Sequence, residues 1–241
     1  MVYQCHASLC VEFTCLALAG GENINMAFSV QDPTLSMIKR KAQILEKLIC
    51  QYPKLLEELN KELFIQFKEE AIQGACDDKE VENSIFFEKM KAFDDDEDMK
   101  NIFYQSMLLM VYAYYESATN LLAKEARTKQ IIKAICSSKN ITLSKEAMND
   151  IDFIDDEVNA LRNNICHNNS GTPRKIDVLR RIAQNSNEIH FNEDVISITG
   201  PNYILNVLEK ESKILLELAD KLGYKNKLYS NGQLKKIKAD K

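Results

Sequence analysis

An apolar run between Ala147 and Ile165 is the feature that most constrains the fold. Its apolar residues recur at steps of four and three, at Ala147, Ile151, Ile154, Val158, Leu161 and Ile165. That spacing places them on one face of an α-helix, whereas a strand would divide them between its two faces. Ser144 is suited to cap the start of this helix, and the polar residues 168–171 are typical of its end. We therefore predict an amphipathic helix here.

Other segments share this period, so we predict an all-α fold. Apolar stripes occur at residues 35–49, 55–67 and 203–222, and Pro53 predicts a break between the first two. Residues 99–127 are apolar nearly all round, which is typical of a helix at the centre of a bundle. The 241 residues include only 7 glycines and 4 prolines, too few for the many turns of a sandwich or barrel. The expected architecture is a helical bundle with a small β-hairpin-like insertion at 189–198, before the last helix.

The two ends of the chain differ from the rest. Residues 1–30 contain three of the seven cysteines but no lysine or arginine, so they lack the basic start of a secretory signal. Met26 is an alternative start of the native chain. The residues from 226 onwards are polar and basic, and we expect a flexible tail. The helical domain is predicted to span residues 31–225.

We expect no metal and no cofactor. Ligation by Cys5, His6, Cys10 and Cys15 is conceivable, but their spacing matches no common zinc pattern. The acidic run 94–98 directly precedes a predicted helix, where carboxylates favour the positive end of the helix dipole, so we prefer this explanation to a metal site. The odd number of cysteines without a C-x-x-C pair indicates reduced thiols and a cytoplasmic protein. No apolar run is long enough to span a membrane.

The net charge of −5 excludes a globally basic nucleic-acid binder. Any contact with a phosphate backbone must come from a local patch. A short predicted helix at 173–184 carries such a cluster, formed by Arg174, Lys175, Arg180 and Arg181. These residues are candidates for RNA binding, although an ordinary solvated helix face would look the same.

Three residues near the end of the amphipathic run could cleave a phosphodiester. RNA cleavage without a metal needs a base, an acid and a cation that stabilises the growing charge on phosphate oxygens. His167 suits either proton transfer at neutral pH, and the planar fork of Arg162 fits a phosphate. Asn163 can orient these groups. The alternative is that Arg162 and His167 are ordinary polar residues at a helix end, where His interacts favourably with the dipole.

The spacing of the three residues restricts how they can act together. On a straight helix Arg162 and His167 would lie about 140° apart, while Asn163 and His167 would share a face. The motif of one chain therefore needs a helix that ends or bends near Cys166, or an Arg side chain that wraps over. Two chains that pair their motifs at a two-fold interface would supply both an acid and a base.

The segment Leu-Arg-Asn-x-Ile-x-His at 161–167 resembles the signature of the HEPN superfamily, an Arg, a polar residue and a His four to six residues after the Arg. The order of elements is similar over roughly residues 35–224. The resemblance implies a helical bundle, commonly a homodimer with two motifs in one cleft. Active members are metal-independent endoribonucleases, many of them toxins or anti-phage effectors, and a toxin would have an antitoxin protein as partner.

In some members of this superfamily an acidic residue on a preceding long helix supports the site, and Glu116 is the matching candidate here. A carboxylate within so apolar a helix needs a partner or a functional reason. Two other interpretations stay open. One is a catalytically silent HEPN-like module that binds a nucleotide or a partner protein, because membership of a fold family does not establish catalysis. The other is a structural helical protein without a site.

Overall fold

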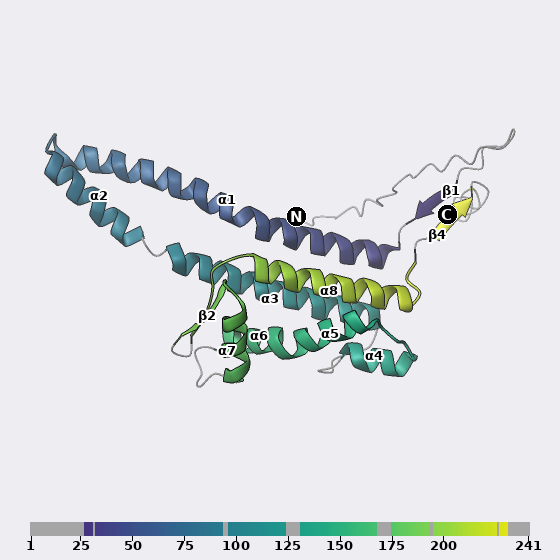
Figure 1. The fold of residues 1–241 in the computed structure, drawn as a ribbon. Helices are drawn as coiled ribbons and strands as arrows, with labels where there is room; N and C mark the ends of the chain where they lie inside the picture. The colour runs from purple at the N-terminus through teal and green to yellow at the C-terminus, as the bar shows by residue number, and fades with distance from the viewer. Residues whose placement is uncertain are drawn as a thin grey trace. The chain divides into compact units, whose positions relative to one another are not determined.

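The computed structural model describes residues 27–30, 32–93, 96–123, 131–167, 175–192, 195–225 and 227–230. Within these ranges the fold is all-α with small two-stranded sheets, so the predicted fold class is confirmed. The helices are α1 (Pro33–Ala75), α2 (Lys79–Phe93), α3 (Asp96–Ala123), α4 (Ile131–Lys139), α5 (Lys145–Phe153), the π-helical turn η1 (Ile154–Val158), α6 (Asn159–His167), α7 (Ile176–Asn185) and α8 (Asn202–Lys221) (Figure 1).

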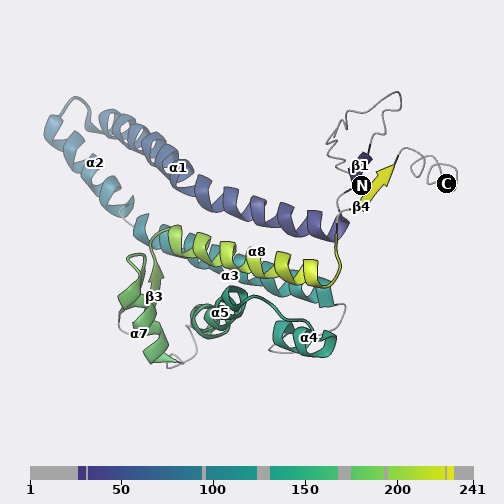
Figure 2. The same cartoon turned by 45° about the vertical axis from the view of Figure 1, so that its right-hand side comes forward.

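The chain divides into two compact units. The larger unit comprises residues 41–117 and 144–214, and the smaller unit comprises the remainder. Three helices, α1, α3 and α8, contribute residues to both units. All three residues of the predicted motif lie in the larger unit. In both views α3 and α8 run side by side (Figures 1 and 2).

Two side-chain caps and one glycine mark the ends of three helices, and the predicted Ser144 cap is among them and is confirmed. The Asp32 side chain accepts hydrogen bonds from the backbone N–H groups of Thr34 and Leu35, and thereby caps α1. Ser144 caps α5, since its Oγ accepts a hydrogen bond from the N–H of Ala147 at 3.1 Å. Gly223 follows α8 with φ of 87°, a conformation that favours glycine at a helix end.

The predicted break at Pro53 is wrong. Residues Pro33–Ala75 form one continuous helix with Pro53 in its interior. Packing on both sides of the proline offsets the lost hydrogen bond. Leu45 and Ile49 are buried before it and Ala71 after it. The ring of Tyr52 is stacked on that of Phe103 of α3, with centroids 3.4 Å apart.

The predicted amphipathic helix is divided by a π-helical turn. In η1 the N–H of Asn159 reaches the carbonyl oxygen of Ile154, five residues back, so this turn holds one residue more than an α-helical turn. The buried positions shift accordingly. Ala160 and Asn164 are buried after the turn, while Ile165, which the even spacing placed in the core, is only half-buried.

The core of the larger unit is formed by several elements that are distant in the sequence. The side chains of α3, α7 and the hairpin meet those of α5, η1, α6 and α8. Its fully buried members include Leu108, Val111, Ile151, Ile154, Val158, Leu161, Leu179, Ile182, Ile189, Ile196, Ile198, Ile204 and Val207. The prediction that α3 is enclosed on all sides is wrong for the described residues, because Met99, Ile102 and Met110 are exposed.

The predicted hairpin is confirmed. Strands β2 (Ile189–Asn192) and β3 (Val195–Ile198) pair antiparallel, with Ile189 opposite Ile198. A second antiparallel pair joins β1 (Ala27–Val30) to β4 (Lys227–Ser230), so four residues of the predicted extension lie beside four of the predicted tail. Residues 1–26, including Cys5, His6, Cys10 and Cys15, lie outside the described residues, as does most of the tail.

The Ser144 cap gives a first prediction. Ser144→Ala should lower the free energy of unfolding by about 1 kcal/mol, because an orphan N–H of α5 loses its acceptor. Urea unfolding followed by circular dichroism measures this change. Ser137→Ala is the matched control, since Ser137 is an exposed residue of α4 whose Oγ donates to the carbonyl oxygen of Lys133. Equal effects of the two substitutions would contradict the capping role.

Candidate functional site

Arg162 is held against α3 by its guanidinium group. The guanidinium carbon lies 5.5 Å from the centroid of the Tyr112 ring, a cation–π contact within the larger unit. One terminal nitrogen donates a hydrogen bond of 2.9 Å to Oδ1 of Asn163. Arg162 as a whole is only half-buried. The side chain is therefore oriented by two neighbours before any ligand arrives.

A chain of asparagine side chains continues from Arg162 along the helix. The Asn163 amide donates to Oδ1 of Asn159 at 3.0 Å, one turn earlier. Because the amide nitrogen of Asn163 is used in this way, its oxygen is fixed toward Arg162. Asn164 has another role, since it is buried and its amide donates to the carbonyl oxygen of Ala160. Asn164 is buried because the extra residue of the π turn rotates it toward the core.

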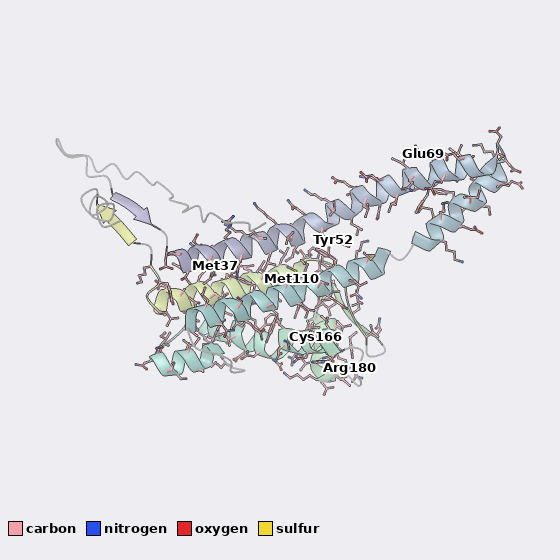
Figure 3. All side chains as sticks on the ribbon, turned by 180° about the vertical axis from the view of Figure 1, so that it is seen from behind. Met37, Tyr52, Glu69, Met110, Cys166 and Arg180 are labelled. Atoms are coloured by element: carbon pink, nitrogen blue, oxygen red, sulfur yellow. The ribbon has the colours of Figure 1, made fainter. Side chains whose placement is uncertain are left out.

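His167 is the last residue of α6, and its side chain is exposed. Helix α6 ends at His167, directly after Cys166, so of the expected alternatives the helix end near Cys166 is the one found. Figure 3 labels Cys166, the residue before His167, and Arg180 on α7. Asn163 lies one turn before His167 and shares its face, whereas Arg162 lies about 140° away around the axis. The structure therefore brings Arg162 and Asn163 together and leaves His167 on a different side of the helix from Arg162.

Glu116 is exposed near the end of the apolar part of α3. It lies one turn after Tyr112. Because its side chain is in contact with solvent, it is not the carboxylate in an apolar environment that the sequence predicted. That description fits Glu211 of α8 instead. Glu211 is fully buried, and neither carboxyl oxygen has a hydrogen-bond partner within the described part of the chain.

The buried carboxyl group of Glu211 changes the electrostatics around α3. Burial raises its pKa well above the ordinary range, and the charge of Glu116 raises it further. Burial thus favours the neutral form of this carboxyl group. The sequence carried a signal for this residue. Glu211 occupies an apolar position of α8, three residues after Leu208 and four before Leu215.

Two tyrosines of α3 lie beside these groups. Burial is the main cause that raises the pKa of Tyr112 to about 12, and the guanidinium of Arg162 opposes this rise. Burial also raises the pKa of Tyr114 to about 12, although a hydrogen bond with Ser212 of α8 lowers it slightly. Both phenols are therefore neutral at physiological pH.

The predicted basic cluster is largely engaged with carboxylates. Lys175 and Arg181 both reach Asp156 of η1, at 3.0 and 2.8 Å, and Arg181 also lies 3.4 Å from Glu157. The hydrogen bond from Lys175 is the main cause that lowers the pKa of the Asp156 carboxyl, and the hydrogen bond from Arg181 is the next. Arg180 is exposed and lies 3.9 Å from Asp177. These pairs join the start of α7 to the π turn, and Arg174 lies outside the described residues.

Comparison of the chain with protein-family models, with curated proteins and with solved structures finds no match. Within the described ranges, no group of three or more His, Cys, Asp or Glu side chains is placed to hold a metal ion. None of the helices described is long and apolar enough to cross a membrane.

Glu211 gives a prediction with a defined sign. Above the ordinary Glu pKa of about 4.5, the folded state keeps a proton that the unfolded state releases. Stability should therefore fall as pH rises, by at most about 1.4 kcal/mol per pH unit from this group. Glu211→Gln should flatten this dependence and exceed the wild type in stability at pH 8. The free energy of unfolding is measured by urea unfolding at several pH values between 4.5 and 8.

The matched control is Glu209→Gln, a change on the same helix at an exposed residue that pairs only with Lys213 at the surface. This variant should keep the pH dependence of the wild type. A Glu211→Gln variant that follows the wild-type curve would show that Glu211 ionises normally in the folded chain.

Proposed function

We propose that this chain is a metal-independent endoribonuclease. The observation that carries the proposal is the preset side chain of Arg162, which Tyr112 and Asn163 hold while the residue stays half-exposed. An arginine fixed in this way can receive a phosphate with little further ordering, and its planar fork matches two phosphate oxygens. The nearby Asn163 and the exposed His167 complete the set that the reaction needs.

The proposed reaction begins with attack of a ribose 2′-hydroxyl on the adjacent phosphorus. A neutral His167 accepts the hydroxyl proton as the 2′-oxygen forms its bond to phosphorus. A protonated His167 donates a proton to the 5′-oxygen as the bond from phosphorus to that oxygen breaks. Arg162 stabilises the negative charge on the phosphate oxygens during this change. The products are a 2′,3′-cyclic phosphate and a free 5′-hydroxyl.

The two protonation states of His167 require two copies of the motif. Within one chain, Arg162 and His167 point to different sides of α6, and a single histidine cannot be acid and base in the same step. We therefore propose a homodimer in which two α6 helices face each other across a two-fold axis. The Arg of each motif would then lie beside the His of the other.

The biological role follows from the resemblance alone. We propose a cytoplasmic toxin or anti-phage effector, restrained by an antitoxin protein. In this proposal RNA approaches along α7, where Arg180 is more exposed than Lys175 and Arg181 of the same predicted patch, to which Arg174 also belongs. Glu116, exposed beside Tyr112, would support the charge on Arg162.

A silent binding module is the second candidate, and one observation favours it. Arg162 is half-buried and already donates to Asn163, an arrangement that also suits the static binding of a nucleotide phosphate. Such a module would bind RNA or a nucleotide without breaking a bond. Product analysis distinguishes the two functions directly.

Incubation of the purified protein with total RNA and transfer RNA in the presence of chelator tests the proposal. We expect cleavage by the wild type and a loss of about 100-fold or more in Arg162→Ala and in His167→Ala, since general acid–base catalysis and charge stabilisation each contribute at that level. Arg162→Lys should remain strongly impaired, because it keeps the charge but not the planar fork.

The matched control is His190→Ala. His190 is also exposed, but it lies on β2 near Thr199. This variant should cleave like the wild type. Loss of activity in chelator would indicate a metal-dependent nuclease instead. Binding of RNA without cleavage by any variant would favour the silent module.

A further inference from the structure

Helix α1 carries a second apolar stripe whose residues are exposed in the described part of the chain. Ile44, Leu48, Leu55 and Leu59 are between 43% and 63% exposed. At about 100° per residue they lie within about 60° of one another around the helix. The buried residues Leu45 and Ile49 lie on another side, which packs into the fold. In Figure 3 a row of side chains projects from α1 on the side away from α3.

The spacing of these four residues is symmetric. Ile44, Leu48, Leu55 and Leu59 are separated by four, seven and four residues. The spacing reads the same in both directions, so two copies of α1 laid antiparallel place Ile44 against Leu59 and Leu48 against Leu55. The two-fold axis then passes between residues 51 and 52. Such a contact is isologous, because each residue pair forms twice, once on either side of the two-fold axis. It is the commonest way in which identical chains pair.

Two charged residues on the same face of α1 are placed symmetrically about the same axis. Lys41 lies three residues before Ile44, and Glu62 lies three residues after Leu59. Both are exposed on the side of the stripe, and neither has an ion-pair partner within the described part of the chain. In the antiparallel arrangement Lys41 of one copy lies beside Glu62 of the other, at both ends of the contact.

The charge of the whole helix favours the same orientation. From Pro33 to Lys54, α1 carries five lysines and arginines and one glutamate. From Leu55 to Ala75 it carries five glutamates and two lysines. Two antiparallel copies bring the basic half of each against the acidic half of the other. A parallel pair would bring like charges together along its full length.

We infer that the exposed face of α1 binds a second copy of this chain as an antiparallel two-helix contact. The surface consists of Lys41, Ile44, Leu48, Leu55, Leu59 and Glu62. It is separate from the motif on α6, and the inference does not depend on ribonuclease activity. Failure of the cleavage assay would leave it unaffected.

The first test is the mass of the full-length protein in solution, measured by light scattering after size exclusion over a range of concentrations. Leu48→Glu/Leu55→Glu should halve the mass of the assembly, because four carboxylates would meet at the centre of the contact. Phe87→Glu/Val195→Glu is the control, since it also replaces two exposed apolar residues, on α2 and β3. The control should keep the wild-type mass.

The second test exchanges the charges. Lys41→Glu and Glu62→Lys should each raise the dissociation constant about tenfold, because each creates two like-charge contacts per dimer. The double variant Lys41→Glu/Glu62→Lys should return to within a few-fold of the wild type. Within one chain these residues are 21 positions apart, about 32 Å along the helix, so the rescue can only act between chains.

Several results would overturn the inference. A wild type that is monomeric at the highest concentration would do so. An assembly that Leu48→Glu/Leu55→Glu leaves unchanged would show that the chain associates through another surface. A double charge variant as weak as the single variants would exclude the antiparallel register. Circular dichroism confirms that each variant keeps its helices, and the surface charge variants decide the question should the leucine variants unfold.

Discussion

The π turn at Ile154–Val158 determines where the functional residues of this chain point. Its extra residue rotates everything after it relative to α5. Asn164 therefore faces the core, Arg162 reaches Tyr112 of α3, and Asn163 meets Asn159. Asp156 within the turn also binds Lys175 and Arg181, so the same five residues hold the start of α7. One local departure from α-helical geometry thus sets both the orientation of the motif and the position of the basic helix beside it.

Buried and half-buried ionisable groups make the region around α3 electrostatically unusual. The phenol of Tyr112 interacts electrostatically with both the carboxyl group of Glu211 and the guanidinium group of Arg162. Glu211 is a buried polar group without a hydrogen-bond partner in the described part of the chain, which lowers stability. A sacrifice of stability of this kind is common at functional sites and has no obvious benefit in a purely structural helix bundle.

Periodicity alone predicted most of the helices, because an apolar stripe records which face is buried. Residue types at the element ends predicted the Ser144 cap and the hairpin. Both failed where tertiary packing overrides a local rule. Stacking of Tyr52 on Phe103 carries α1 through Pro53, and the π turn leaves Ile165 half-buried although its spacing is regular. At the site, the sequence identified Arg162, Asn163 and His167 as candidates. It drew attention to Glu116 when the buried carboxylate is Glu211, because burial depends on which helix lies opposite.

The central claim is that one chain cannot complete the site, because Arg162 and His167 lie on different sides of α6. Mixed dimers test it most directly. Wild-type chains and inactive His167→Ala chains are unfolded together and refolded in varying proportions, and RNA cleavage is measured at constant total protein. If both histidines of a pair are needed, activity should fall with the square of the wild-type fraction, to about one quarter in an equal mixture. A linear fall, with about half the activity remaining, would show that each chain cleaves on its own and would contradict the account.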